Sequence, residues 1–339
     1  MAIFSDVFVD VTRYGTKIPQ ENYLSEGLYQ IIDQGQNEIA GYSNNPDGLF
    51  TDVPAIIFGD HTRVFKYVDK PLFLGADGVK LLKAKDDNAN YKYLYYALCS
   101  AKIPDTGYNR HFKWLKEVEI PLPDATTQEK IVAILNTVNA LITSHKQQLA
   151  KLDELVKARF VEMFGDPIKN TQKRPVLPFF EVVTMQRGFD LPINDRDHEG
   201  KIPVFGSNGI LDYHNIATIQ GGGVITGRSG TIGKVYYTEN DYWPLNTTLF
   251  SANTHGNNIV YLSYLLELYN LSRFAEGSGV PTLNRNVFHH NPIINIPLPE
   301  QGRFAAFVLK IQKLRLTIRQ GLDTMEILKR ALLQEYFGT

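Results

Sequence analysis

Apolar residues recur in steps of three and four along two long stretches of the chain, and in the first stretch the two steps alternate. In the first stretch they are Ile131, Leu135, Val138, Ile142, Leu149, Leu152 and Val156. In the second they are Val308, Ile311, Leu314, Ile318, Leu322, Met325, Leu328 and Leu332. This spacing predicts two helices with coiled-coil seams, each of about 36 residues and roughly 55 Å. Thr126 and Glu129 have capping-box spacing at the start of the first. His145 takes a seam position there, while Arg315 and Lys329 interrupt the second seam.

The two stretches are copies of one another. Ile-Pro-Leu-Pro precedes each, at 120–123 and at 296–299, and Phe-Gly closes each. Apolar positions stay in phase over the whole length of both stretches, so we infer a tandem duplication. Aligning Gln128 with Gln301 pairs Leu141 with Leu314 and Leu155 with Leu328.

The segments ahead of each predicted helix mix short strand-like runs with turns. Residues 52–59 predict a buried strand, and Tyr91–Cys99 predicts a short helix. Gly223–Gly227 matches Ala55–Gly59, so the globular segments are also repeats, although they have diverged more than the helices.

These patterns predict an α/β (α+β) fold with a pseudo-twofold internal repeat. The predicted order is a globular domain at 1–123, a helix at 124–174, a globular domain at 175–299 and a helix at 300–339. Because each helix has one apolar stripe, we expect the two to pack as an antiparallel coiled coil that separates the globular domains.

Composition narrows the class of protein. The 339 residues contain one cysteine, Cys99, which excludes internal disulfides and favours a reducing cytoplasm. No apolar run is long enough to span a bilayer and no leader pattern opens the sequence, so we expect a soluble cytoplasmic protein without membrane contact. The net charge is only −1, so any binding of nucleic acid must depend on local basic patches.

No catalytic motif is recognisable. The glycine-rich run at 221–230 lacks the Gly-Lys-Ser/Thr of a phosphate-binding loop, because Gly227 is followed by Arg228 where that loop requires lysine. The Asp/Asn-Pro-Pro-aromatic tetrapeptide of amino-methyltransferases is missing. His289 and His290 have no nearby partners of metal-ligand spacing, so we expect no metal site. The sequence therefore predicts a protein that is not an enzyme.

The arrangement resembles the specificity subunit of type I restriction–modification enzymes, over the whole chain. The resemblance rests on two diverged globular segments, each followed by a preserved helix, and on four sequence motifs. These motifs are Ile120–Pro123, Gln128–Ile131, Leu155–Pro167 and the Gly-Ser-Gly-Val-Pro-Thr-Leu run at 277–283.

The resemblance implies that each globular domain reads one half of a bipartite site in double-stranded DNA. It also implies that the helices set the spacer and dock two copies of a methyltransferase subunit, and that a motor-nuclease (restriction) subunit joins for cleavage. This chain would bind no cofactor itself. S-adenosylmethionine would be bound by the methyltransferase, and ATP and Mg²⁺ by the motor-nuclease. At about 3.4 Å per base pair, a rod of roughly 55 Å spans about 16 base pairs.

Candidate DNA contacts are basic and amide side chains in polar segments, because Arg and Lys read guanine and Asn and Gln read adenine. In the first domain they are Arg13, Lys17, Gln34, Gln36, Asn37, Tyr42, Asn44, His61, Arg63, Tyr108, Asn109, Arg110 and Lys113. In the second they are Gln186, Arg187, Arg196, Ser207, Asn208, His214, Arg228, Ser229, Asn284 and Arg285. We favour Arg228, because the glycines beside it let the backbone approach a phosphate. Asn109-Arg110 and Asn284-Arg285 recur at equivalent places, which also permits a structural role.

The sequence leaves two alternatives open. The chain could be an adenine methyltransferase in its own right, although it lacks the tetrapeptide. It could also be a structural adaptor whose globular ends bind proteins rather than DNA.

Overall fold

Two long helices organise the computed structural model. These are α4 (Ala125–Phe164) and α8 (Leu298–Phe337). The structure describes residues 1–75, 77–107, 109–277, 279 and 281–338, so that Tyr108, Ser278 and Val280 lie outside the described residues. The chain forms two compact units, a first with residues 1–145 and 321–339 and a second with residues 146–320. The units cut across the predicted segments 124–174 and 300–339, because each long helix contributes residues to both.

The globular part of the first unit, called domain 1 below, contains two small sheets. The four-stranded sheet has the order β2 (Phe8–Asp10), β8 (Val79–Ala84), β5 (Ala55–Gly59), β6 (Phe65–Val68), and all its pairs are antiparallel. The three-stranded sheet has the order β4 (Gly41–Ser43), β3 (Tyr29–Ile32), β7 (Leu72–Leu74). The other elements are β1 (Ala2–Ile3), α1 (Phe4–Val7), η1 (Thr12–Tyr14), η2 (Gln20–Asn22), α2 (Tyr91–Cys99), α3 (Phe112–Leu115) and β9 (Glu119–Ile120).

The globular part of the second unit, domain 2, repeats the strand order of both of these sheets. Its sheets have the orders β11 (Thr184–Arg187), β17 (Thr248–Asn253), β14 (Gly223–Gly227), β15 (Val235–Thr238) and β13 (Gly209–His214), β12 (Ile202–Gly206), β16 (Trp243–Pro244). Its other elements are β10 (Val176–Pro178), α5 (Phe179–Val182), η3 (Ile193–Asp195), α6 (Ile259–Tyr269), η4 (Leu271–Phe274), β18 (Ala275–Glu276), β19 (Thr282–Leu283), α7 (Arg285–Phe288) and β20 (Pro292–Ile294). The predicted internal repeat is confirmed.

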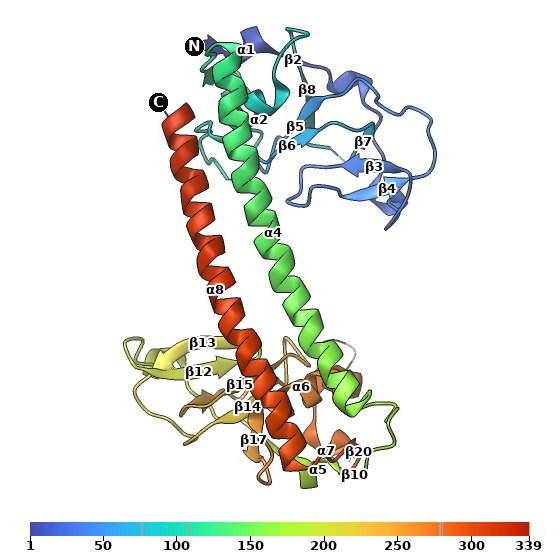
Figure 1. Cartoon of the computed structure of the whole chain (residues 1–339), viewed down its shortest axis with the longest axis vertical. Helices are drawn as coiled ribbons and strands as arrows, with labels where there is room; N and C mark the ends of the chain where they lie inside the picture. The colour runs from blue at the N-terminus through green and yellow to red at the C-terminus, as the bar shows by residue number, and fades with distance from the viewer. Residues whose placement is uncertain (76, 108, 278, 280, 339) are drawn as a thin grey trace. The chain divides into compact units, whose positions relative to one another are not determined.

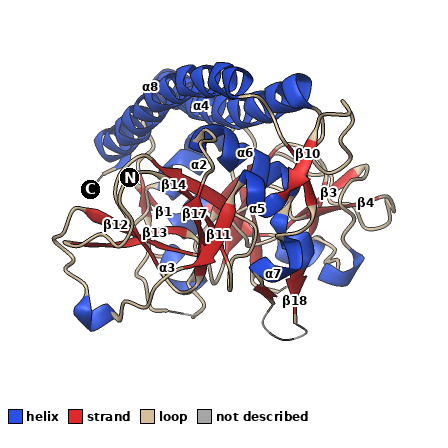
Figure 2. Ribbon diagram, turned by 90° about the horizontal axis from the view of Figure 1, so that it is seen from below, coloured by secondary structure: helices blue, strands red, loops and turns tan. Residues whose placement is uncertain are grey.

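Apolar burial joins each domain to its part of the helix pair. In the second unit, α6 lies between the sheet and the long helices (Figure 2), because its apolar residues contact both Val224 of β14 and the helix residues Phe160 and Phe304. In the first unit, α2 takes the same place, and Ile131 and Phe337 share its core.

The helices pack antiparallel, as predicted. In the first unit the start of α4 shares a core with the end of α8, and in the second unit Val156 and Phe160 of α4 share one with Phe304 and Val308 near the start of α8 (Figure 1). Among the predicted seam residues, Ile131, Leu135, Val138, Ile142, Leu152, Val156 and Val308 are buried, and Leu149, Ile311, Ile318, Leu322, Met325 and Leu332 are half-buried.

The predicted seam positions of Leu314 and Leu328 in the second helix were wrong, and so was the predicted capping residue of the first helix. Leu314 and Leu328 are 47% and 40% exposed, whereas Arg315 takes the seam position and pairs with Asp153 on α4. A long arginine can cover apolar surface with its stem while its guanidinium reaches a carboxylate. The first helix is capped by Asp124 rather than by Thr126, because the Asp124 carboxylate accepts from the Thr127 backbone N–H at 3.0 Å.

Candidate nucleic-acid interface

Three segments meet at one end of the sheet of domain 2, and we call this the loop end of domain 2. They are the turn Ser207–Asn208 between β12 and β13, the segment Arg228–Ser229 after β14, and the turn Asn246–Thr247 before β17. The carbonyl of Thr247 accepts from the backbone N–H groups of Arg228 and Ser229 at 2.8 and 3.2 Å. These bonds tie the two turns together.

Glycine lets the segments approach this closely. A Cβ on Gly227 would lie 1.8 Å from the carbonyl oxygen of Thr231 and 3.0 Å from that of Ser207, so no other residue fits there. The carbonyl of Arg228 accepts from the backbone N–H of Leu283 at 2.7 Å, which brings the start of α7 to the same place. The predicted residues Asn208, Arg228, Ser229 and Asn284 are therefore brought together.

The side chain of Arg228 differs from its backbone in having no polar partner among the described residues. Its backbone is bonded on both sides, whereas its half-buried guanidinium forms no hydrogen bond or ion pair with any residue in the described parts of the chain. A second cation lies at the same loop end, since Lys234 donates to the side-chain oxygen of Asn208 at 3.1 Å. Sequence reasoning missed Lys234, whose only signal was its place just after the glycine-rich run.

The loop end of domain 1 is built from the corresponding segments. They are the loop Asp33–Asn37 after β3, the segment Asp60–Arg63 after β5, and the turn Asp77–Gly78 before β8. Gln34, two residues beyond its strand as Asn208 is, joins all three: its side chain accepts from the His61 backbone N–H at 3.2 Å and donates to the Asp77 carbonyl at 3.1 Å. Gln36 and Asn37 are exposed in the same loop.

Carboxylates accompany the cations in domain 1. Lys17 pairs with Asp77 at 2.6 Å, and this hydrogen bond lowers the pKa of Asp77. Arg63 pairs with Asp105 at 2.7 Å; the pKa of Asp105 is lowered chiefly by the Gly107 backbone N–H and then by Arg63. A phosphate would therefore have to displace these carboxylates.

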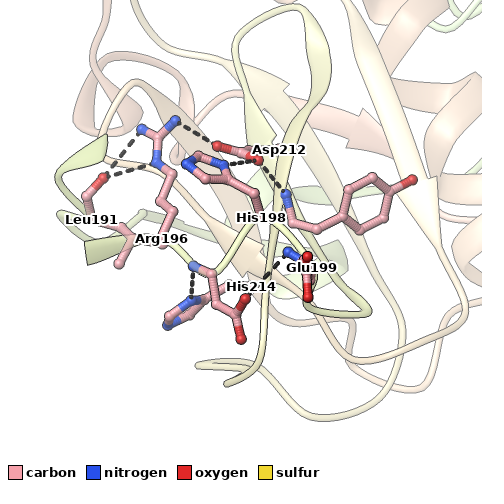
Figure 3. Close-up of polar contacts among 8 residues, drawn as sticks. Leu191, Arg196, His198, Glu199, Asp212 and His214 are labelled. Carbon is pink, nitrogen blue, oxygen red and sulfur yellow. Dashed lines mark hydrogen bonds and ion pairs between the residues drawn. The ribbon is translucent and has the colours of Figure 1, made fainter. Parts of the chain in front are cut away.

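Another predicted DNA contact, Arg196, is bound by residues of its own domain. Arg196 is mostly buried and donates to the Leu191 carbonyl and to Asp212, which also binds His198 at 2.9 Å (Figure 3). The hydrogen bond from His198 is the largest of the causes that lower the pKa of Asp212. Arg196 thus holds η3 to β13, and its role in DNA binding stays a prediction.

The supposed equivalence of Asn109-Arg110 and Asn284-Arg285 was wrong. In domain 1 the backbone N–H of His111 donates to the carbonyl of Asp60, the residue after β5, and in domain 2 the backbone N–H of Leu283 donates to the carbonyl of Arg228, the residue after β14. Arg110 therefore precedes the donating residue, whereas Arg285 follows it. Asn284 caps α7 by accepting from Asn286, and Arg285 donates to the Met185 carbonyl at 3.3 Å. A two-residue motif is too short to fix an alignment across diverged loops.

The remaining candidates are exposed. Arg13 and Lys113 lie over the rings of their neighbours Tyr14 and Trp114, at 4.6 and 4.8 Å from the ring centroids. Arg187 is exposed at the end of β11. The described residues contain no group of His, Cys, Asp and Glu side chains that could hold a metal ion, and none of their helices is long and apolar enough to cross a membrane.

Comparison with known proteins gives a consistent picture. The model of the type I restriction modification DNA specificity domain matches residues 5–154 and again residues 178–324. The chain is 28% identical over 149 residues to the EcoR124I/EcoR124II specificity subunit of Escherichia coli, a match that covers 39% of this chain and 37% of that protein. It is 24% identical over 272 residues to a putative type I restriction enzyme specificity subunit of Haemophilus influenzae, S.HindORF215P, covering 70% of this chain and 68% of that protein.

The fold also matches solved structures. The S subunit of a type I restriction-modification system from M. genitalium superposes with a TM-score of 0.62 at 17% identity, covering 98% of this chain and 94% of that one. A chain from a structure on complex assembly and conformational transition of the type I R-M system superposes with a TM-score of 0.52 at 14% identity, covering 99% and 95%.

Proposed function

Because the chain belongs to the family of type I restriction modification DNA specificity domains, we propose that it is the non-catalytic DNA-recognition subunit of such a complex. In this proposal each domain reads one half of a bipartite site in double-stranded DNA with its loop end. The observation that carries it is the repeated topology, in which the two loop ends occupy the same place on the same scaffold but present different side chains. Two readers of this kind select two different half-sites.

The outer surface of the helix pair supports the docking of a partner in two copies. Leu141 and Leu328 in the first unit, and Leu155 and Leu314 in the second, are 40–47% exposed. They are two aligned pairs of the repeat, so the duplication maintains apolar residues that the helix seam does not bury. Exposed apolar residues in a repeated pattern favour a protein interface. We propose that each unit docks one methyltransferase subunit there, and that a motor-nuclease subunit joins the assembly.

In this proposal the cofactors are bound by the partner subunits. S-adenosylmethionine would be held by the methyltransferase, and ATP and Mg²⁺ by the motor-nuclease. The present chain would supply sequence recognition and geometry alone.

Sequence-selective binding of duplex DNA tests the proposal. Affinity for a randomised duplex library is measured for the chain with and without the methyltransferase, and the bound duplexes are sequenced. The expected result is enrichment of two short half-sites at a fixed separation. An adaptor would enrich no sequence, and methyl transfer by the purified chain alone would identify an enzyme instead.

The spacer role has its own test. We expect that four residues inserted between Gln147 and Gln148 of α4 lengthen the tolerated spacer and leave both half-sites unchanged, because an added helical turn lengthens the helix without touching either loop end. An altered half-site would contradict the role of the helices as a ruler.

Docking is tested by counting subunits with native mass spectrometry. Leu141→Lys with Leu328→Lys is expected to remove one methyltransferase copy, and Leu155→Lys with Leu314→Lys the other. Thr143→Lys, an exposed position on α4 outside these pairs, serves as the control. Retention of both copies in both double variants would place the docking surface elsewhere.

A further inference from the structure

A shallow, mainly apolar hollow lies beside the β12–β13 turn of domain 2. Its volume is about 450 Å³, and its walls include Asn208, Gly209, Ile210, Val235 and Tyr236. Gly209 has φ +100°, and a Cβ there would lie 3.2 Å from the ring of Tyr236, so glycine keeps this hollow open to the turn. The hollow thus adjoins the amide of Asn208 and the loop end of domain 2.

The strand that leaves the turn presents aliphatic side chains to solvent. Ile210 and Leu211 are 53% and 62% exposed. The register shifts between Val204 and Phe205, which makes Leu211 the extra residue of a β-bulge, since Phe205 pairs with Ile210 and Val204 with Asp212. Bulges redirect side chains and are frequent beside functional sites.

Domain 1 lacks this feature at the corresponding strand. Its β4 is Gly41-Tyr42-Ser43, and Gly41 pairs with Ile31 as Ile210 pairs with Phe205. The aliphatic surface is therefore specific to domain 2, as expected for a device that reads sequence rather than one that holds the fold.

The chemistry of DNA identifies what such a surface recognises. In the major groove the edges of the bases are polar, except for the methyl group at C5 of thymine, and an amide reads adenine through N6 and N7. An apolar hollow next to an amide therefore suits a thymine methyl group next to an adenine.

We propose that the β12–β13 hairpin reads an adenine with Asn208 and that the hollow, with Ile210 and Leu211, takes the C5-methyl group of an adjacent pyrimidine. This inference rests on the proposed function and names what the loop end of domain 2 reads. Thymine is the natural source of the methyl group, and 5-methylcytosine carries the same group.

The test uses the complex with the methyltransferase and duplexes in which one methyl group at a time is removed. In the half-site assigned to domain 2, each thymine is replaced in turn by uracil, which lacks only the methyl group. One position is expected to weaken binding roughly fourfold, the ratio that burial of one methyl group gives. In Ile210→Ser and Leu211→Ser that penalty is expected to vanish, and Asn208→Ala is expected to relax selection of the neighbouring adenine.

Further duplexes distinguish thymine from 5-methylcytosine as the source of the methyl group. They also distinguish failure of this inference from failure of the proposed function. At the sensitive position, replacing the thymine pair by a 5-methylcytosine pair is expected to bind better than replacing it by a cytosine pair. The inference is overturned if uracil is tolerated at every thymine while selectivity persists, or if the half-site contains no thymine. Loss of all sequence selectivity in the unmodified complex would instead overturn the proposed function. Because Ile210 and Leu211 are solvent-exposed, circular dichroism is expected to show unchanged folding of both variants.

Discussion

The loop ends of domain 1 and domain 2 occupy the same place on the same scaffold and differ in charge. Asp60 and Arg228 each directly follow the central strand of their sheet, and the carbonyl of each accepts a backbone hydrogen bond, from His111 at 2.8 Å and from Leu283 at 2.7 Å. The Asp60 carboxylate turns inward and accepts from the Phe112 backbone N–H at 2.7 Å. The Arg228 guanidinium has no such partner within the described residues. Backbone bonds thus preserve the fold while side chains diverge.

The starts of the two long helices show a second difference. In the second unit Gln301 is fully buried; it donates to Asn257 at 2.6 Å and to the Ile296 carbonyl at 2.7 Å and accepts from the Asn258 N–H at 2.9 Å. Its counterpart in the first unit, Gln128, is half-buried and donates to the Pro123 carbonyl at 2.9 Å. The position of Asn257 is taken there by Ala89, which lines a cavity of about 750 Å³ with Gln128. We call the contact between the start of each long helix and its domain the helix junction. The junction of the second unit is closed by the Asn257–Gln301 hydrogen bond, whereas that of the first unit contains a cavity and is open.

The largest effect is expected at this junction. Gln301→Ala should lower the free energy of unfolding of the second unit by about 3 kcal/mol, because it leaves several buried polar groups without partners. Gln128→Ala, the matched control, should cost about 1 kcal/mol. Trp243 reports on the second unit and Trp114 on the first, so urea unfolding followed by fluorescence in Trp114→Phe and Trp243→Phe backgrounds separates the two. Equal costs would contradict the difference in closure.

Arg228→Ala should weaken DNA binding by the complex by about 1–3 kcal/mol if Arg228 contacts a base, or reduce the salt slope by about 1 if it contacts a phosphate. Lys17→Ala is expected to cost less, because Lys17 must first leave Asp77. Affinity is measured over a series of salt concentrations. An unchanged affinity and slope in Arg228→Ala would remove this residue from the interface.

Closing the open junction is expected to have a smaller effect of the opposite sign. Ala89→Asn should stabilise the first unit by about 0.5–2 kcal/mol, the usual gain from filling a cavity, by providing the bridge that Asn257 provides in the second unit. The reverse change, Asn257→Ala, should destabilise the second unit. If Ala89→Asn raises neither the free energy of unfolding nor the thermal midpoint, the two junctions differ in more than this side chain.

The smallest effect concerns pH and domain 2 alone. The folded pKa of Asp212 lies below its unfolded value of about 3.9, so its contribution is present above that pH and disappears as the pH falls toward the folded pKa. Between about pH 5 and pH 3 the thermal midpoint of the wild type should therefore fall more steeply than that of Asp212→Asn. Parallel curves would mean that the Arg196–Asp212–His198 contacts do not contribute.

Periodicity made the helices and the duplication predictable, because a buried seam repeats along the sequence and tolerates little change. It was misleading for Leu314 and Leu328, since an exposed apolar residue at helical spacing has the same signal in the sequence as a buried one. The convergence of Asn208, Arg228 and Ser229 was not readable from sequence, because it depends on hydrogen bonds between turns far apart in the chain. The hollow beside Asn208 was missed for the same reason.

We propose that the two loop ends read DNA independently of one another, and selection of duplexes from a library tests this independence. The complex with the methyltransferase selects from a randomised library, first with the wild-type chain and then with a chain altered at Asn208 and Arg228 together. The account predicts that one half-site changes, while the other half-site and the spacer stay the same. A change in both half-sites, or in the spacer, would contradict it.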